Sequence, residues 1–269
     1  MVPTLKDIFD TLDRIAPFSI AQDWDNSGLQ IGTFSKEIKK IFISLDPSLK
    51  ALQEASRRQA QLLLTHHPLI FGSFFCIDGD VYPGNVITEA LRTDIAVLAA
   101  HTNLDVARGG INDMLADLFD LLEVEILEME TGSEQGGIGL GRLGSLEKPL
   151  ALSEIIERAK QVLDVEKVGV VGPKDSRIKR VAVVGGSGGG MVSLASKKGA
   201  DLLITGDISH HEARKAEDLG LALLDGGHFS TEKAALHLFA DRFSVKLREL
   251  GWQVLVEIYK AEEAPMWYR

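Results

Sequence analysis

A repeated segment restricts the fold of this chain more than any other feature of its sequence. Residues 38–65 align without a gap on residues 178–205, at a constant offset of 140 positions. Eight aligned pairs are identical: Ile38/Ile178, Lys39/Lys179, Ala55/Ala195, Ser56/Ser196, Ala60/Ala200, Leu62/Leu202, Leu63/Leu203 and Thr65/Thr205. Buried strands resemble one another by chance, but here polar positions match as well, which favours an internal duplication. The chain is therefore expected to contain two related α/β halves.

Each repeat has the pattern strand, helix, strand. Short apolar segments predict strands at 40–45, 61–65, 95–100, 181–184, 202–205, 221–224 and 252–259, and helical stretches lie at 5–15, 48–58 and about 230–250. Apolar strands that lack a polar face and alternate with helices are typical of largely parallel sheets covered on both sides. The expected fold class is thus α/β, with βαβ-rich halves and mixed, largely parallel sheets.

Capping signals place the helix ends. Thr4 followed by Asp7 predicts a capping box at the start of the first helix. Asp46-Pro47 supplies a candidate N-cap and N1 proline for the helix at 48–58, and Gly251 occupies the C′ position after the last long helix.

The repeat also suggests domain bounds. We expect a first half at 1–127 and a second half at 128–269. Segment 128–177 fits neither repeat and is predicted to be an inserted hairpin followed by a helix. A functional site is expected in the cleft between the halves.

Composition excludes several classes of function. The formal net charge of −10 disfavours bulk nucleic-acid binding and anionic membranes. No apolar run approaches the roughly 18 residues of a membrane helix, and the N-terminal residues lack the pattern of a secretory signal. A single cysteine, Cys76, cannot form an internal disulfide, which favours a reducing, cytoplasmic location. Because Cys76 follows two phenylalanines, we expect it to be buried.

Metal-ligating residue types follow the predicted strands. Parallel strands place their ligands at their carboxyl ends. The candidates at those ends are His66, His67, His101, Asp105, His228 and Glu232. Imidazole and carboxylate together suit zinc, manganese, iron or nickel, and more than four candidates exceed the needs of one tetrahedral ion. The set therefore predicts two divalent ions.

Each of these residues also has a purely structural interpretation. One of His66 and His67 could cap its strand, and Glu232 could interact only with a helix dipole. His210 and His211 are interpreted as a pocket wall rather than as ligands. The polar segment 24–28, Trp-Asp-Asn-Ser-Gly, is either a turn or one wall of the cleft.

Two glycine-rich motifs offer rival functions. Residues 185–189 fit the G-x-S-x-G pattern around Ser187, with Asp225 and His228 downstream, which would suit a serine hydrolase. A glycine-rich segment matches that pattern easily by chance. Such a turn more often lets a backbone or an anion approach the N-terminus of a helix. Residues 139–144 fit G-x-G-x-x-G, but no helix is predicted after them, so a dinucleotide fingerprint is not expected.

The motifs in combination resemble a known family. They are Trp24-Asp-Asn-Ser-Gly-Leu-Gln-Ile-Gly32, Thr65-His-His-Pro-Leu-Ile-Phe71, His101-Thr-Asn-Leu-Asp105, Thr205-Gly-Asp-Ile-Ser-His-His211 and Gly227-His-Phe-Ser-Thr-Glu232. They are similar to those of the Nif-three-like proteins, many of which are known as GTP cyclohydrolase I type 2 homologues. The resemblance implies a duplicated α/β fold, a dinuclear metal centre and a ring-shaped homohexamer. It places the ligands at His66, His67, Asp105, His228 and Glu232, with His101 beside them for proton transfer or substrate binding.

The leading expectation is therefore a metal-dependent hydrolase of the GTP cyclohydrolase I type 2 homologue kind. Its substrate would be a nucleotide-like or phosphorylated small molecule, its cofactors two divalent ions per chain, and His101 its general acid or base. A non-catalytic metal-binding scaffold is the alternative, because ligands alone show binding and not turnover. A serine hydrolase that uses Ser187 is the third interpretation.

Overall fold

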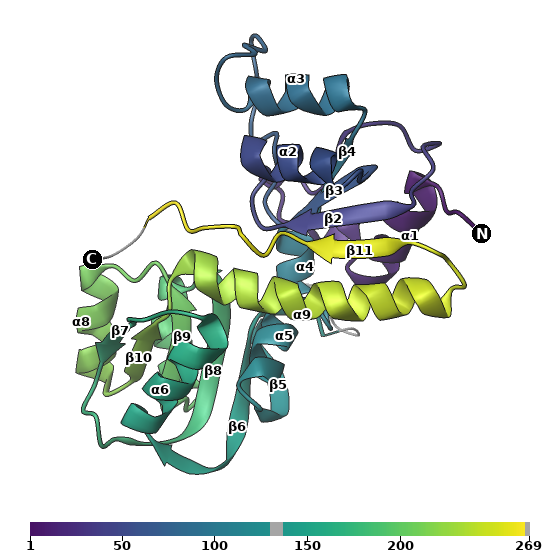
Figure 1. Cartoon of the computed structure of the whole chain (residues 1–269). Helices are drawn as coiled ribbons and strands as arrows, with labels where there is room; N and C mark the ends of the chain where they lie inside the picture. The colour runs from purple at the N-terminus through teal and green to yellow at the C-terminus, as the bar shows by residue number, and fades with distance from the viewer. Residues whose placement is uncertain (130–136, 267–269) are drawn as a thin grey trace. The chain divides into compact units, whose positions relative to one another are not determined.

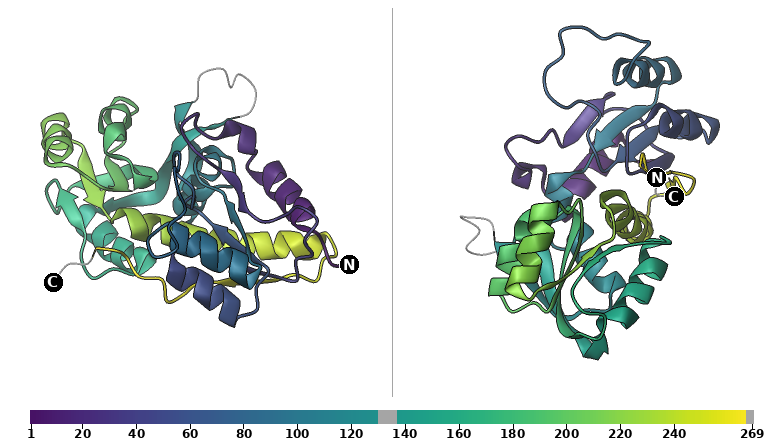
Figure 2. Two further views of the ribbon diagram at one scale, coloured as in Figure 1. Left: turned by 90° about the horizontal axis from the view of Figure 1, so that it is seen from above. Right: turned by 90° about the vertical axis from the view of Figure 1, so that its left-hand side faces the viewer.

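The computed structural model of this chain describes residues 1–129 and 137–266 (Figures 1 and 2). Contacts between residues group the chain into two compact units. Unit 1 contains Met1–Leu104 and the C-terminal segment from His237, and unit 2 contains Asp105–Leu236. These bounds differ from the halves expected from the repeat, because the last strand of the chain pairs with a strand of unit 1.

The sheet of unit 1 has the strand order β1-β4-β3-β2-β11. Strand β1 is antiparallel to β4, and the other neighbours are parallel. Helices α2 and α3 pack on one face, against Phe42, Leu63 and Val97, and α1 lies on the other face (Figure 1). The bounds are α1 Leu5–Ile15, β1 Gly28–Ile31, β2 Lys40–Ser44, α2 Leu49–Arg57, β3 Leu62–Thr65, α3 Gly84–Thr93, β4 Ala96–Ala99 and β11 Leu255–Ile258.

The sheet of unit 2 has the order β5-β6-β8-β9-β10-β7. Strands β8, β9 and β10 are parallel, and the remaining pairs are antiparallel. Helices α7 and α8 cover one face, and α6 lies on the other (Figure 2). The bounds are α5 Ile111–Leu118, β5 Leu122–Met129, β6 Gly139–Ala151, α6 Leu152–Leu163, β7 Gly169–Val171, β8 Arg177–Ser187, α7 Val192–Lys197, β9 Leu202–Gly206, α8 His210–Leu219 and β10 Ala222–Asp225.

Two helices cross the boundary between the units along the chain. The short helix α4 spans Thr102–Val106, and the long helix α9 spans His228–Glu249. Short 3₁₀ turns lie at Phe18–Ile20 and Gly189–Met191. No helix among the described residues is both long enough and apolar enough to cross a bilayer.

The strand register reproduces the sequence repeat. In unit 1, Ile41 pairs with Leu62, and in unit 2, Val181 pairs with Leu202. Both members of the second pair lie 140 positions after those of the first. The expected fold class is confirmed, since both units are mixed sheets covered by helices.

Local signals were accurate at most helix ends. The capping box of Thr4 and Asp7 is present, and Gly251 follows α9 with a φ of +75°. The helix start assigned to Asp46-Pro47 was wrong: Ser48 caps α2 by accepting a hydrogen bond from the backbone N–H of Ala51.

Two further expectations concern segments outside the parallel strands. β5 and β6 form an antiparallel pair that α6 follows, as expected for 128–177, although residues 130–136 lie outside the described part. The expectation that Cys76 is buried was wrong. Its thiol is exposed, because the loop that carries it also exposes its phenylalanines.

Candidate metal centre

Three histidine side chains of unit 1 converge at the carboxyl ends of β3 and β4. The ring centroids of His66 and His67 are 5.1 Å apart, and those of His101 lie 5.3 and 5.4 Å from them. Each residue offers one ring nitrogen within 4.8 Å of the others, so this group could hold a metal ion. We call it the histidine cluster.

The backbone explains why two adjacent histidines face the same way. Neighbouring residues of a regular strand point to opposite faces, but β3 ends at Thr65. Beyond it, the N–H groups of His66 and His67 donate to Ser44 and Leu45, and the Thr65 hydroxyl donates to the carbonyl of His67 at 2.7 Å. This turn brings both imidazoles together.

Each ring of the cluster is oriented through its Nδ1 atom. His66 Nδ1 lies 2.8 Å from the Ala100 carbonyl, which can only accept, so this nitrogen carries the proton and Nε2 carries the lone pair. His67 Nδ1 lies 2.7 Å from Asp46, and His101 Nδ1 lies 2.7 Å from Asp25. A carboxylate or carbonyl on Nδ1 is the usual support of a histidine that ligates a metal through Nε2.

Asp25 is the most deeply enclosed of these supports, with no solvent-exposed side-chain surface. Burial alone would raise its pKa. Hydrogen bonds from His101, Thr102 and Ser27 outweigh that effect and hold the pKa of the Asp25 carboxyl far below its usual range. The carboxylate therefore stays charged and fixes the ring of His101.

Asp46 is held from the other end of the chain. The backbone N–H groups of Leu45 and Asp46 both donate to the carboxylate of Glu262 at 2.8 Å. Glu262 is buried and belongs to unit 1. A residue near the C-terminus thus fixes the loop whose aspartate orients His67.

Unit 2 presents a different group. At the start of α9, His228 Nε2 lies 3.1 Å from the Glu232 carboxylate, and its Nδ1 lies 2.7 Å from Asp207. The hydrogen bond with Glu232 raises the pKa of His228 to about 9; burial opposes this rise, and Asp207 adds to it. The pair therefore holds a proton at neutral pH, at the position where a divalent cation could replace it.

The glycine-rich turn at 185–190 makes room for this pair. Gly186 has a φ of +66°, and a Cβ there would collide with the Glu232 carboxylate. A Cβ at Gly189 would collide with the carboxylate of Glu212. Two carboxylates therefore face the turn, which does not suit an anion. The glycines serve close packing instead.

The serine-hydrolase interpretation finds no support in this turn. Ser187 is exposed at the end of β8. The Asp225 carboxylate accepts from the backbone N–H groups of Ile208 and Gly227, and the acid that holds His228 is Asp207 instead. The Ser-Asp-His relay that the sequence order suggested is thus not assembled.

The remaining candidates lie in unit 2. Asp105 is half-buried in α4, and its carbonyl accepts from Asn112. His210 and His211 are exposed at the start of α8, where Ser209 and Glu212 form a capping box. The sequence candidates therefore divide between the units: the cluster of three histidines belongs to unit 1, and Asp105, His228 and Glu232 belong to unit 2.

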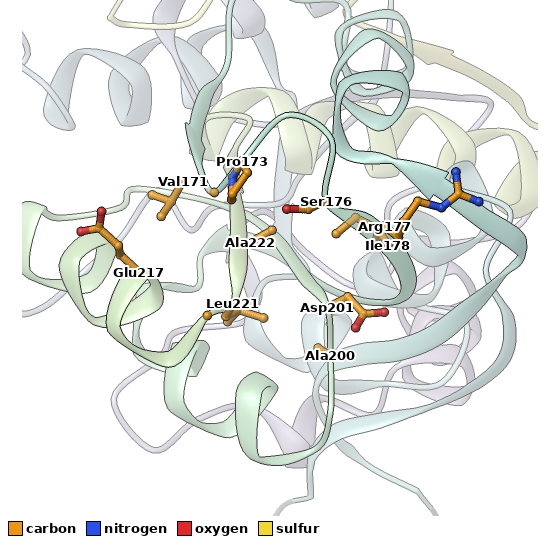
Figure 3. A pocket seen from close by; sticks show the side chains of 12 residues that line it. Val171, Pro173, Ser176, Arg177, Ile178, Ala200, Asp201, Glu217, Leu221 and Ala222 are labelled. Carbon is orange, nitrogen blue, oxygen red and sulfur yellow. The ribbon is translucent and has the colours of Figure 1, made fainter.

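A cavity of about 590 Å³ opens elsewhere in unit 2, at the amino ends of β9 and β10. Arg177 and Glu217 lie on opposite sides of it in Figure 3. The Asp201 carboxylate, which also lines it, accepts from the backbone N–H groups of Lys179 and Arg180. The cavity thus gathers no set of ligating side chains, unlike the strand ends that carry the histidines.

The donor atoms suit a transition-metal ion. Imidazole nitrogens and carboxylate oxygens match its preferences. The imidazoles of the histidine cluster and of His228 are all oriented through Nδ1. Sequence reasoning missed the supporting acids Asp25, Asp46 and Asp207. Asp25 lies in the polar turn at 24–28 and Asp207 in the Thr205–His211 motif. Both segments were recognised in the sequence, but neither aspartate was assigned to a histidine.

Fold and donor set together define a mixed α/β protein with a candidate metal centre. Comparison with known proteins makes this specific. Residues 3–265 match the family model Duf34/NIF3 (NGG1p interacting factor 3), and the chain belongs to this family.

Relatives of the chain carry one shared name. A "GTP cyclohydrolase 1 type 2 homolog" of Clostridium perfringens is 35% identical, over 90% of this chain and 92% of that protein. One of Methanocaldococcus jannaschii is 34% identical, over 90% and 95%. Among solved structures, a Bacillus cereus protein related to NIF3 has a TM-score of 0.92 at 26% identity, covering 100% of this chain and 99% of that one.

Proposed function

We propose that this chain is a dinuclear metal-binding protein and a metal-dependent hydrolase. Its ligands would be His66, His67, Asp105, His228 and Glu232. The observation that carries the proposal is the common orientation of the imidazoles, each with Nδ1 held by a carboxylate or carbonyl.

The bound cations would supply Lewis-acid activation of water and of the bond attacked. The chain itself would move the proton. His101 is the proposed general acid or base, because Asp25 fixes its Nδ1 and leaves proton transfer to Nε2.

The proposed substrate is a nucleotide-like or phosphorylated small molecule. The names of the relatives support this choice, since they refer to GTP. The chain has a net charge of −10, and carboxylates face its glycine-rich turn. Neutralising the phosphates would therefore fall to the cations of the centre.

The proposal extends to assembly and location. Membership of the Duf34/NIF3 family supports a homohexamer, and the single cysteine supports a cytoplasmic location. Light scattering of the purified protein tests the first, and a mass of one chain would contradict it.

Metal content per chain tests the central claim. Elemental mass spectrometry of tag-free protein should give close to two transition-metal ions per chain. His67→Ala in unit 1 and Asp105→Ala in unit 2 should each lose at least one of them, while His211→Ala, an exposed histidine outside the cluster, should lose none. No metal in the reconstituted wild type, or unchanged content in both variants, would contradict the proposal.

The same preparations separate an enzyme from a scaffold. An enzyme should hydrolyse GTP or a related nucleotide, lose turnover in Asp105→Ala, and lose it in His101→Ala. A scaffold would lose metal in Asp105→Ala but show no turnover in any preparation. Activity that survives chelators but not Ser187→Ala would favour the serine hydrolase.

A further inference from the structure

Two exposed aromatic side chains stand beside the histidine cluster of unit 1. Trp24 is 61% exposed and Phe71 is 59% exposed. Their ring centroids are 6.0 Å apart at an interplanar angle of 63°, and Trp24 lies 6.0 Å from the ring of His101 at 76°. Since neither contact is a parallel stack, much of both aromatic rings still faces solvent.

The backbone that carries these rings is firmly held. The residue after Trp24 is Asp25, which accepts hydrogen bonds from Ser27 at 2.7 Å and from the Thr102 hydroxyl at 2.6 Å. Thr102 Oγ1 in turn accepts from the N–H of Gln22 at 3.0 Å. Trp24 therefore projects from a turn that is fixed on both sides.

Phe71 is tied to the same turn. The Asn26 side chain donates to the carbonyl of Ile70 at 2.8 Å, and the N–H of Ile70 donates to Gln30 at 3.0 Å. Gln30 also donates to the carbonyl of Asn26 at 2.7 Å. Polar side chains thus hold Phe71 next to Trp24, whose ring in turn contacts His101.

An exposed aromatic ring forgoes the free energy that burial would give it. A rigid pair that keeps its rings exposed beside polar, ligating groups has the composition of a small-molecule site, in which apolar surface binds the ligand and a few polar groups orient it. Phe75, which lies in the same loop as Phe71, has no such setting. Phe75 is fully exposed and has no ring contact among the described residues.

We propose that Trp24 and Phe71 form an aromatic rim on which a planar nitrogen heterocycle of the substrate stacks. The histidine cluster would then lie at the edge of the bound ring, with His101 the nearest imidazole. Stacking on an aromatic side chain accepts any flat heterocycle, so the rim selects for a base but not for one particular base. The inference rests on the proposed function and specifies which part of the substrate the chain recognises.

Calorimetric titration with two matched probes tests the rim. Guanosine 5′-monophosphate carries a heterocycle, and ribose 5-phosphate has the same charged group without it. Wild-type protein should bind the nucleotide at least tenfold more tightly than the sugar phosphate. Trp24→Ala should lose about tenfold in affinity for the nucleotide, within the range of one base stacked on one side chain. Its affinity for ribose 5-phosphate should stay unchanged.

Two variants complete the experiment. Trp24→Phe should restore most of the affinity, because it keeps an aromatic face. Phe75→Ala removes a more exposed ring from the loop that carries Phe71 and should change neither affinity.

The inference is overturned if wild-type protein binds both probes equally or binds neither. It is also overturned if Trp24→Ala keeps wild-type affinity for the nucleotide. Light scattering covers a third outcome: a change of mass in Trp24→Ala with nucleotide affinity intact would identify the rim as a contact between copies. Metal content is read separately and should not change in Trp24→Ala, so a failure of the metal proposal is distinguishable from a failure of the rim.

Discussion

The two units share a strand register but end their strands in different chemistry. At its strand ends unit 1 gathers three imidazoles, whereas unit 2 pairs the imidazole of His228 with the buried carboxylate of Glu232. The strand that follows each repeat, β4 in unit 1 and β10 in unit 2, accounts for part of the difference. Thr65 pairs with Ala99 and Thr205 with Asp225, so His101 stands two residues beyond its strand pair and His228 stands three beyond. A common scaffold thus fixes the place of a site, and the residues just beyond the strands decide its ligands.

The supports behind the imidazoles differ as well. In unit 1, Asp25 is fully enclosed, and in unit 2 the side chain of Asp207 is 52% exposed. Unit 2 relies instead on the glycine-rich turn at 185–190, against which Glu232 packs. One site is thus held by buried hydrogen bonds and the other by close packing, and substitutions can separate the two.

The largest effect is expected in the glycine-rich turn of unit 2. Gly186→Ala must adopt a positive φ and push its Cβ into the Glu232 carboxylate. We expect the free energy of unfolding to fall by about 3 kcal/mol, from backbone strain and crowding together. Thermal and denaturant unfolding measure this loss.

The same turn provides the control. A Cβ at Gly190 meets nothing within 4 Å, and its φ is not positive, so Gly190→Ala should leave stability nearly unchanged. Equal losses in the two variants would mean that the turn is merely intolerant of alanine and that Glu232 plays no part.

A smaller effect is expected at the carboxylate behind His101. Asp25→Asn should lower the free energy of unfolding at pH 7 by about 2 kcal/mol, because it removes charged hydrogen bonds from an enclosed site. Asp207→Asn should cost at most about 0.5 kcal/mol, since exposed pairs are screened by water. Unfolding of both variants beside wild type at pH 7 measures the contrast.

The pH dependence of this contrast has a definite sign. The pKa of Asp25 is lower in the folded protein than the value of about 4 in an unfolded chain. Its stabilisation is therefore present above pH 4 and is lost as the pH falls through the folded-state pKa. The gap between wild type and Asp25→Asn should narrow in acid, and a gap that widens there would contradict the assignment.

At His228, the pKa is a better measurement than the free energy of unfolding. In metal-free protein, the ring resonances of His228 should titrate near pH 9, because Glu232 holds the proton. Since this pKa is raised, the pair stabilises the fold below the unfolded value of about 6.5 and stops doing so as the pH rises through 9.

Glu232→Gln removes the main cause of the shift. The pKa of His228 should then fall toward its ordinary value. A midpoint near pH 6.5 in the unsubstituted protein would refute the pairing of the two side chains.

Sequence reasoning reached the framework of this molecule but not the contacts behind its site. The repeat at 38–65 and 178–205 predicted the strands, and the strand register found in the two units follows the same offset. The strand ends then indicated where ligating residues gather. Both inferences depend on local periodicity and on the rule that parallel strands present ligands at their carboxyl ends.

The supporting acids escaped because each is distant in sequence from its histidine. Asp25 lies 76 residues from His101, and no local pattern links them. Asp46 was misread for a physical reason: aspartate before proline is a good helix start, and only the fold shows that Ser48 caps the helix and Asp46 contacts His67. The exposure of Cys76 could not be predicted either, because apolar neighbours in a loop do not reveal whether that loop packs against the rest of the protein.

The contact of Glu262 with the backbone of Leu45 and Asp46 bears on how the protein is made. Synthesis produces His67 well before Glu262, the residue that fixes the loop behind it. Until the ribosome has added Glu262, the loop lacks this anchor, and Asp46 is not held against the imidazole of His67. Orientation of His67 is therefore completed only after Glu262 has emerged.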